Sequence, residues 1–292
     1  KSWGVEAGLI GPEETRDKVP ILDPGQIQGA YWVPSDGIAK AVRAGEAMAR
    51  MAEGATFHGE TMVEGFEVES GRVQAVLTAR GRIETEQVLL CAGIWGARIG
   101  RMAGVTIPLV PVQHLYTTTA PLVELAGETR EVVHPVLRHQ DRAMYFRQHA
   151  DCYGIGSYRH EPLLVDDRLD PDEAAGSPAT RAFTPEHSAE GPQNAVELLP
   201  PLGHVELATR INGIFSFTPD GMPLIGECPE LGDFWAAEAV WITHAGGVGR
   251  AVAEWMAEGT PGMDLREADI NRFPAHARTA EYVRTRGAQQ YR

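Results

Sequence analysis

The sequence predicts a mixed chain, in which part of a parallel α/β unit is joined to an antiparallel sheet in α+β fashion. The run Val88–Gly93 is almost entirely apolar, as expected for a strand of a parallel sheet that is covered on both faces. Strands expected between residues 112 and 212 instead alternate apolar and polar side chains, which is typical of an antiparallel sheet with one wetted face. A later apolar strand, Phe234–Thr243, runs into the glycine-rich segment His244–Gly249, which opens an amphipathic helix.

The N-terminal part is expected to hold two helices on either side of a short strand. A proline followed by two acidic residues favours a helix start near Pro12. Residues Gly29–Val33 are a strand candidate. The turn Pro34–Gly37 supplies N-cap groups for a helix over Ile38–Glu53, whose apolar positions fall on or near one face before Gly54 ends it.

An antiparallel meander with short turns is expected next. Its predicted strands are Ala55–Thr61, Met62–Glu69, Arg72–Thr78 and Ile83–Glu86. The meander leads into the buried strand Val88–Gly93 and then into a short helix over Ala97–Ala103. This order is typical of the second half of a nucleotide-binding α/β domain.

The middle of the chain is expected to form the antiparallel sheet. Its predicted strands are Val112–Thr119, Val132–Leu137, Ala143–Gln148 and Tyr153–Tyr158. The polar segment Asp166–Gly191 is interpreted as a mobile loop, followed by a helix over Gln193–Leu202.

The last part is expected to return to the first unit through the strand Ile214–Phe217. A helix over Val248–Glu258 follows, then an extended segment and a short helix from Glu281. The predicted units are residues 1–111, the second half of the α/β domain; 112–212, the antiparallel sheet; 213–270, the return; and 271–292, a tail.

Composition excludes several functional classes. The formal net charge of −14 argues against nucleic acid, because binding phosphates calls for a clustered basic surface. There is no apolar run of the roughly 18 to 20 residues that a membrane helix needs, and no signal peptide is visible. Three cysteines without a CxxC favour a reducing, cytoplasmic setting. The histidines form no HxH or HExxH pattern, so we expect no metal site.

Two segments late in the chain form a glycine-rich pair, Phe215–Gly226 and His244–Gly249. Backbone amides at a helix start can hold an anionic or electron-rich group, and glycines let that backbone approach closely. An ordinary glycine-started helix is the alternative. The dinucleotide fingerprint G-x-G-x-x-G is not found, since its nearest match, Gly247–Val252, ends in valine.

The paired segments resemble the C-terminal flavin-contacting part of FAD-dependent amine oxidoreductases, in the dimethylglycine/sarcosine dehydrogenase branch of the D-amino-acid-oxidase superfamily. The resemblance implies an FAD cofactor and a partial FAD-binding α/β domain beside a substrate-binding antiparallel sheet. It also implies that an N-terminal segment or a partner subunit supplies the pyrophosphate-binding unit. The cofactor-binding residues implied are Val63, Ala92, Gly93, Trp95, Phe217, Pro219, Asp220, Gly221, Met222, His244, Ala245, Gly246, Gly247 and Val248.

Two strands carry the residues expected at the amine. His114 and Tyr116 share one strand face by the period of two, and so do Tyr145 and Arg147. The family likeness implies that His114 and Tyr145 are catalytic and that Tyr116, Arg147 and, more weakly, Tyr158 bind substrate. Arg147 or Arg138 could hold a carboxylate through two hydrogen bonds. The alternatives are a hydrogen-bonded interfacial histidine and solvated edge arginines.

The implied reaction is oxidative demethylation of an N-methylated amino acid such as dimethylglycine or sarcosine, by hydride transfer to FAD. An iminium product would hydrolyse to formaldehyde and the demethylated amine. Another secondary or tertiary amine is an alternative substrate. A flavin-free protein that binds partners or small acids without catalysis is an alternative of a different class.

Overall fold

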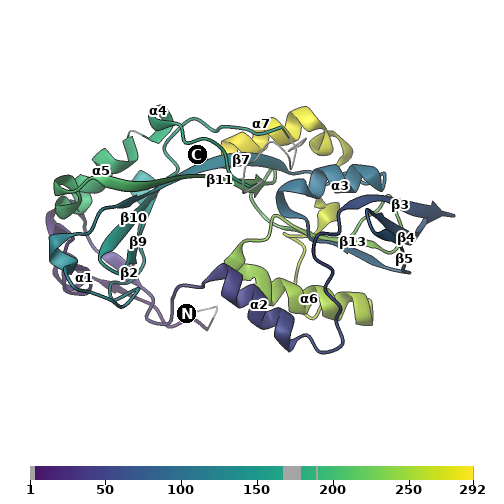
Figure 1. Ribbon diagram of the computed structural model, residues 1–292, viewed down its shortest axis with the longest axis horizontal. Helices are drawn as coiled ribbons and strands as arrows, with labels where there is room; N and C mark the ends of the chain where they lie inside the picture. The colour runs from purple at the N-terminus through teal and green to yellow at the C-terminus, as the bar shows by residue number, and fades with distance from the viewer. Residues whose placement is uncertain (1–3, 167–178, 189, 292) are drawn as a thin grey trace.

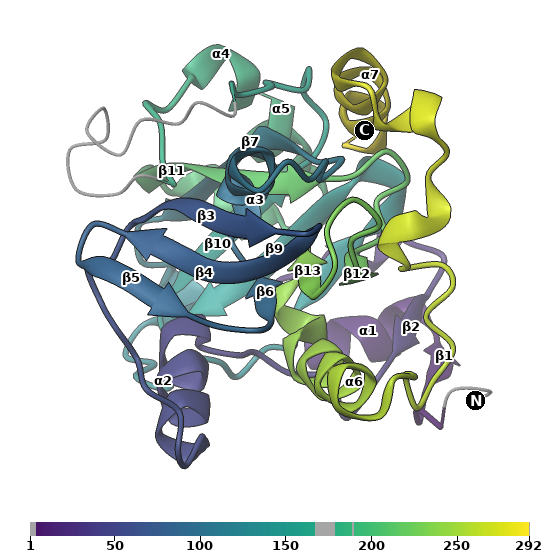
Figure 2. The same cartoon turned by 90° about the vertical axis from the view of Figure 1, so that its right-hand side faces the viewer.

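The computed structural model describes residues 4–166, 179–188 and 190–291, and these form several sheets, the largest of which contains two long strands (Figures 1 and 2). The helices are α1 Pro12–Lys18, α2 Ala41–Met51, α3 Gly96–Met102, α4 Pro185–Ser188, α5 Glu190–Leu198, α6 Ala245–Glu258 and α7 Ala280–Gln290. The strands are β1 Gly8–Ile10, β2 Ala30–Trp32, β3 Val63–Glu69, β4 Arg72–Thr78, β5 Gly81–Glu84, β6 Val88–Leu90, β7 Val110–Thr119, β8 Leu137–His139, β9 Met144–His149, β10 Cys152–Ser157, β11 Leu207–Phe217, β12 Leu224–Glu227 and β13 Phe234–Glu238.

The largest sheet has five strands in the order β11-β7-β10-β9-β8, and every neighbouring pair is antiparallel. This confirms the antiparallel sheet expected in the middle of the chain. The two longest strands, β7 and β11, pair along their whole length and lie along the upper edge of the molecule in Figure 1. The strand expected to return to the first unit is therefore part of this sheet, and β11 runs through the position 212/213 where a unit boundary was placed.

A second sheet has the order β12-β13-β6, in which β13 pairs in parallel with β6. The apolar run at residue 88 is thus a parallel strand, as expected. Among the described strands, β6 is hydrogen-bonded to β13 alone, so its other edge is open. Leu89 on this edge strand is 40% exposed.

The meander β3-β4-β5 is confirmed, but two of the predicted strands are wrong. Residues Ala55–Thr61 form an irregular, almost fully exposed segment without a neighbouring strand, and Glu60 in it has a positive φ of 50°. The segment Val132–Leu137 is also irregular, and β8 begins only at its last residue. Here the backbone amides of Val133 and His134 donate to the Gln148 side chain, and Pro135 offers no amide for a strand ladder.

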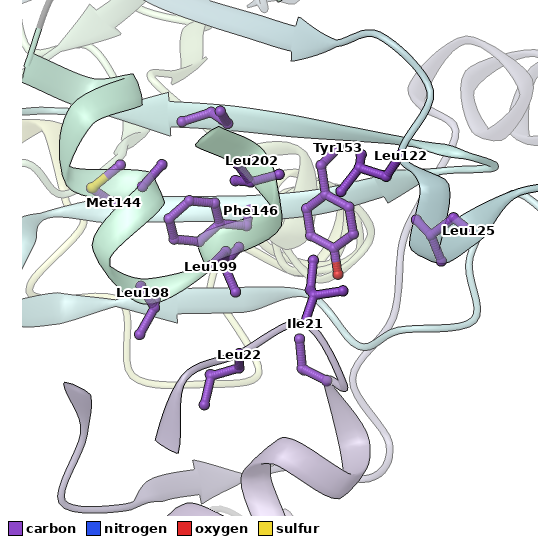
Figure 3. Close-up of a cluster of buried hydrophobic side chains, with 13 residues drawn as sticks. Ile21, Leu22, Leu122, Leu125, Met144, Phe146, Tyr153, Leu198, Leu199 and Leu202 are labelled. Carbon is purple, nitrogen blue, oxygen red and sulfur yellow. The ribbon is translucent and has the colours of Figure 1, made fainter. Parts of the chain in front are cut away.

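The core beside the five-stranded sheet joins segments that are far apart in the sequence (Figure 3). Val19, Ile21 and Leu22 from the N-terminal region pack against Phe146 and Tyr153 of the sheet. Side chains of α5 and the following turn complete the cluster, namely Ala195, Leu198, Leu199 and Leu202. Residues 19–22, which were predicted to belong to the first unit, are therefore held by the five-stranded sheet. Their short apolar run, following α1, buries more surface there than it could alone.

The C-terminal helix α7 lies over one end of the long strands β7 and β11. Val283 and Tyr291 are buried with Val110 and Phe217. Gly287 is needed for this close approach, because a Cβ there would lie 2.5 Å from the Val110 side chain. The C-terminal segment thus covers the sheet at the position of the candidate site.

Two other expectations concern exposed segments. The segment Asp166–Gly191, interpreted as a mobile loop, lies partly outside the described residues, and its described end contains α4 and the start of α5. Helix α2 confirms the expected helix in a shorter form but contributes no buried residue. Across the described ranges, no helix combines the length and the apolar character needed to cross a bilayer.

Candidate active site

One face of the five-stranded sheet gathers the aromatic and imidazole side chains predicted to meet the amine. The register aligns Tyr116 of β7 with Gly156 of β10 and Gly156 with Tyr145 of β9. The two phenol rings stack at 5.9 Å with planes 14° apart. A Cβ on Gly156 would fall inside the Tyr145 ring, and one on Gly154 would meet the Tyr116 hydroxyl. The glycines of the central strand therefore allow both rings to lie over the sheet.

His114 is the centre of this face and is only 3% exposed. Its Nε2 is 2.8 Å from the Tyr145 hydroxyl, and its Nδ1 is 2.8 Å from the Tyr291 hydroxyl. Its ring also stacks on Phe215 and contacts Tyr158, at centroid distances of 4.7 and 4.5 Å. Burial, with a smaller contribution from His160, lowers the pKa of His114 to about 3. The imidazole is therefore neutral, with one nitrogen donating and the other accepting.

The two tyrosines differ in their partners. Burial raises the pKa of Tyr145 far above its usual range, so its phenol stays protonated. Burial also raises the pKa of Tyr116 to about 12. The Tyr116 hydroxyl is 2.8 Å from Nε2 of His149, so its hydrogen-bond partner is His149 and not His114.

The two candidate arginines are placed differently. Arg147 forms an ion pair with Glu131, which also pairs with Lys40. The Arg138 guanidinium lies 6.0 Å from the centroid of the Tyr145 ring, and no ion pair of Arg138 is found among the described residues. Arg147 thus shares a carboxylate of the chain with Lys40, whereas no ion pair of Arg138 is found among the described residues.

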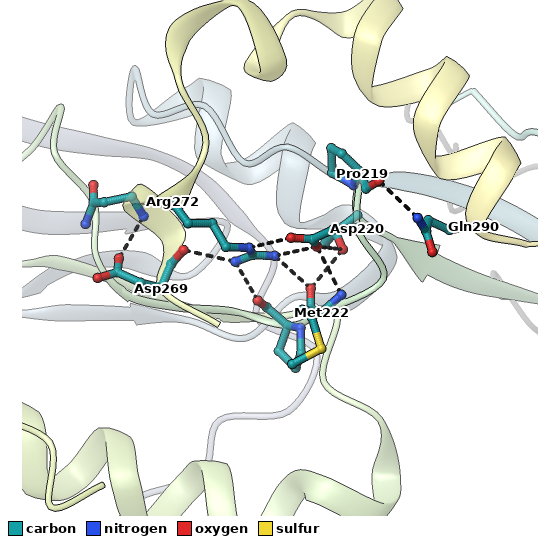
Figure 4. A network of polar contacts seen from close by, with 9 residues as sticks. Pro219, Asp220, Met222, Asp269, Arg272 and Gln290 are labelled. Carbon is teal, nitrogen blue, oxygen red and sulfur yellow. Dashed lines mark hydrogen bonds and ion pairs between the residues drawn. The ribbon is translucent and has the colours of Figure 1, made fainter. Parts of the chain in front are cut away.

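The loop Phe217–Met222 is held in one shape by a polar network (Figure 4). Arg272 donates from Nε and Nη2 to the two carboxylate oxygens of Asp220, at 2.7 and 2.8 Å. The Asp220 carboxylate also accepts from the Met222 amide, and the Arg272 guanidinium donates to the Met222 carbonyl. Gln290 donates weakly to the Pro219 carbonyl, at 3.4 Å. Gly221 completes the turn with a φ of 78°.

The segment His244–Val248 forms the beginning of α6 and is tied to the same region through Trp241. The Trp241 ring meets Phe215 and Phe217 edge to face at 5.5 and 5.9 Å, and its carbonyl accepts from the His244 amide at 2.8 Å. A Cβ added at Gly246 or Gly247 would meet no atom within 4 Å. The backbone at Gly246 and Gly247 of this fourteen-residue helix is therefore open to close approach by a large flat electron-rich group such as a flavin.

The ends of β6 and β13 form a second part of the cofactor region. Ala92 and Gly93 turn into the short helix that precedes α3, with a φ of 55° at Gly93. The Ala92 amide donates to Oε1 of Glu238 at 2.6 Å. Trp95 lies in the same turn. Val63 begins β3 and pairs with Thr78, so it belongs to the meander rather than to this turn.

Three residues were not predicted from the sequence: Glu238 at the Ala92–Gly93 turn, and Tyr291 and His160 near His114. Glu238 is 1% exposed, and its Oε2 has no hydrogen-bond partner among the described residues. Burial raises its pKa to about 8, against the opposing effect of the Ala92 and Gly93 amides. The one acidic residue in the apolar run Phe234–Val240 was the available signal. Tyr291 and His160 gave no local signal, because their role comes only from contacts across the fold.

Within the described ranges, His, Cys, Asp and Glu side chains do not converge in groups of three or more that could hold an ion. The donors at the site are phenols, imidazoles and backbone amides, which suit an organic cofactor and an amine.

Comparison with known proteins supports the same family. The chain is 30% identical to mouse mitochondrial sarcosine dehydrogenase over 303 residues, covering 100% of this chain and 32% of the mouse protein. It is 28% identical to human mitochondrial dimethylglycine dehydrogenase, covering 98% of this chain and 34% of the human protein. The crystal structure of L-proline dehydrogenase from P. horikoshii matches with a TM-score of 0.80 at 27% identity, covering 93% of this chain and 70% of that one.

The chain spans about a third of the length of these curated relatives. Residues 258–292 match the central domain of FAD dependent oxidoreductases. Residues 1–255 match the FAD dependent oxidoreductase family itself, which covers most of the chain. Together with the fold and the geometry of the site, this match shows that the chain belongs to the FAD dependent oxidoreductase family.

Proposed function

We propose that this chain forms the substrate-binding and flavin-contacting part of an enzyme that oxidatively demethylates an N-methylated amino acid of the sarcosine or dimethylglycine type. The observation that carries the proposal is the pair of buried His114 and half-buried Tyr145, joined at 2.8 Å on a sheet face. Phe215 of the same face contacts Trp241, which precedes the glycine-started helix α6. Two relatives are named for sarcosine and dimethylglycine. Bound FAD would supply the hydride acceptor for the N–CH carbon.

The polar groups suit a small amino acid. Neutral His114 and protonated Tyr145 place hydrogen-bonding atoms where an amine could sit without introducing a competing charge. Arg138 at the edge of the Tyr145 ring is the group that we assign to the substrate carboxylate, since Arg147 is paired with Glu131. Tyr158 and Phe215, which contact the His114 ring, exclude water from its neighbourhood.

FAD retention requires more than this chain's own loops. The glycine-rich start of α6 and the Ala92–Gly93 turn suit the flavin, but the pyrophosphate-binding fingerprint is not in the sequence. The open edge of β6 and the exposed apolar side chains of α2, including Met51 at 80%, are suited to a further α/β unit. We infer that an N-terminal segment or a partner subunit covers them.

A visible spectrum tests the cofactor and the substrate together. Flavin bands that bleach anaerobically on addition of sarcosine or dimethylglycine support the proposal. Bleaching by proline alone would indicate another secondary amine as substrate. A protein that stays colourless when mixed with FAD and the missing unit would contradict flavin dependence and favour a flavin-free binding protein.

Two substitutions test the residues in a flavin-loaded form. His114→Ala and Tyr145→Phe should each slow flavin reduction by substrate by about 10²-fold, the lower end of the effect typical of a positioned proton-transfer group. The measurement is anaerobic stopped-flow absorbance. Wild-type rates in both variants would remove the two residues from the site.

A further inference from the structure

Four side chains form a continuous hydrogen-bonded chain from the sheet face to the edge of the molecule. The Tyr145 hydroxyl is 2.8 Å from Nε2 of His114, and Nδ1 of His114 is 2.8 Å from the Tyr291 hydroxyl. That hydroxyl is in turn 2.6 Å from Nε2 of His160. The chain links β7 and β9 to the C-terminal segment and to the loop after β10. The reaction proposed above uses only its first two members.

The outer end sets the direction of the whole chain. Nδ1 of His160 lies 2.8 Å from the backbone carbonyl of Glu161. A carbonyl oxygen can only accept, so Nδ1 of His160 carries a hydrogen and donates it. Burial, and to a smaller degree the neighbouring His187, lowers the pKa of His160, so the ring is neutral near pH 7. Its Nε2 is then a bare acceptor.

The donor and acceptor roles of Tyr291, His114 and Tyr145 then follow from that of His160. Tyr291 has one hydroxyl proton, which it donates to Nε2 of His160, so its oxygen accepts from Nδ1–H of His114. Neutral His114 then has a bare Nε2, which accepts the hydroxyl proton of Tyr145. The Tyr145 oxygen is left with lone pairs only, directed away from His114.

We propose that Tyr291 and His160 are positioning residues that hold His114 in its Nδ1–H tautomer and extend it into a directional proton relay. The relay ends at the half-buried His160. The catalytic role of the relay rests on the function proposed above. The tautomer of His114, in contrast, is a property of this polypeptide with or without substrate. Tyr145 thereby offers an acceptor, rather than a donor, to the nitrogen of a protonated amine.

The proton balance of the relay is simple. The ammonium proton of the substrate passes to the Tyr145 oxygen while the Tyr145 proton passes to Nε2 of His114. The Nδ1 proton of His114 passes to the Tyr291 oxygen, and the Tyr291 proton passes to Nε2 of His160. The net change is a neutral amine and an imidazolium at His160, with no electron transferred.

The surroundings suit a neutral inner part and a charged outer end. His114 is faced by Tyr145, Tyr158, Phe215 and Tyr291, and the Tyr145 ring is faced by the Arg138 guanidinium. The groups that face His160 are the Tyr291 ring, the His187 ring at 6.4 Å and Glu161. Since an inner cation would lie beside Arg138, the proton is better placed at His160, near the Glu161 carboxylate.

Nitrogen-15 NMR of the full chain, with labelled histidine, tests the tautomer without flavin or substrate. At neutral pH we expect His114 to be protonated at Nδ1 and bare at Nε2, and His160 likewise. In Tyr291→Phe the Nδ1–H of His114 loses its acceptor, so the ring should change to the Nε2–H tautomer and donate to the Tyr145 oxygen. His114 protonated at Nε2 in the wild type would overturn the proposal.

Tyr153→Phe is the matched control. It removes another buried phenol bonded to a histidine, since the Tyr153 hydroxyl is 2.8 Å from Nδ1 of His134. His114 should keep its tautomer in this variant. If the tautomer of His114 changed as much in Tyr153→Phe as in Tyr291→Phe, the loss of any buried phenol would be enough to change it. That result would overturn the proposal. If Tyr291→Phe fails to fold, the wild-type tautomer of His160 decides, because Nε2–H at His160 reverses the direction.

This experiment and the flavin spectrum can fail independently. The expected tautomers with no substrate-dependent bleaching would keep the relay geometry and remove the proposed substrate. Bleaching by an N-methylated amino acid with the opposite tautomers would keep the function and remove the relay.

Discussion

The face around His114 and the candidate cofactor region of this chain differ in how far the chain itself encloses them. On the face around His114, both ring nitrogens have partners, and glycines in β10 receive the tyrosine rings. At the start of α6 an added Cβ on Gly246 or Gly247 would meet open space, β6 has an open edge among the described strands, and one oxygen of buried Glu238 has no partner among the described residues. Buried polar atoms without partners occur in both parts of the described structure, since Nε of Arg147 in β9 has none either. The contrast therefore lies in the open strand edge and helix start, which leave the candidate flavin half to be completed by other groups.

The largest effect expected from this contrast is on stability. Phe146→Ala in the core of the five-stranded sheet should lower the free energy of unfolding by about 3–5 kcal/mol, because a fully buried ring leaves a cavity. Leu89→Ala on the open β6 edge should change it by less than about 1 kcal/mol, since that side chain is partly in water already. Urea denaturation measures both. Equal losses would mean that the cofactor half is as closed as the substrate half.

The buried carboxyl of Glu238 should make stability depend on pH. Its folded pKa is raised to about 8 from an ordinary value of 4.5, so between these values the folded protein binds the proton and the unfolded chain does not. The protonated carboxyl therefore contributes to the free energy of unfolding below that pH range. This contribution falls by roughly 1.4 kcal/mol per pH unit as the pH rises through the range.

Glu238→Gln tests this by removing the titration while keeping the shape. The difference in unfolding free energy between wild type and variant should change steadily from pH 5 to pH 8. A difference that is independent of pH would show that the carboxyl is already ionised in the folded protein. Addition of the missing unit should alter the profile if it supplies a partner for Oε2.

The smallest expected effect compares two glycines. Gly246→Ala places a Cβ in open space within a helix, so it should stabilise the flavin-free chain by about 0.5–1 kcal/mol while weakening retention of FAD. Gly156→Ala should instead destabilise the chain, because its Cβ would enter the Tyr145 ring. Thermal unfolding and flavin titration separate the two. Undiminished flavin binding by the Gly246 variant would contradict the assignment of the start of α6 to the cofactor.

Much of the local structure could be predicted because its causes lie within a few residues. The strand β4 has the predicted bounds, β9 and β10 are shifted from the predicted ones by one residue, and α6 begins three residues earlier than predicted and ends where predicted. Of the two wrong strands, Ala55–Thr61 is exposed and has no neighbouring strand to pair with among the described residues, whereas Val132–Leu137 lies where a tertiary contact competes with the local pattern. At Val133 and His134, a distant glutamine side chain takes the amides that a strand would use. No local signal could anticipate that bond.

The candidate site divides in the same way. The period of two placed His114 with Tyr116 and Tyr145 with Arg147, because alternation within a strand is a local property. That Arg147 is already paired with Glu131, leaving Arg138 beside the Tyr145 ring, depends on which strands become neighbours. Tyr291 and Glu238 reach the site from segments 177 and 146 residues away from their partners.

By itself, the sequence determined the two kinds of sheet, the glycine-started helix and the set of side chains able to meet an amine, since hydrophobic period and backbone freedom are written in neighbouring residues. Only the tertiary structure decided which of those side chains are buried, which are paired and in which direction their hydrogen bonds run. Burial and donor–acceptor pairing are set by contacts between distant segments, and they alone make His114 neutral and leave Glu238 with an unpartnered oxygen.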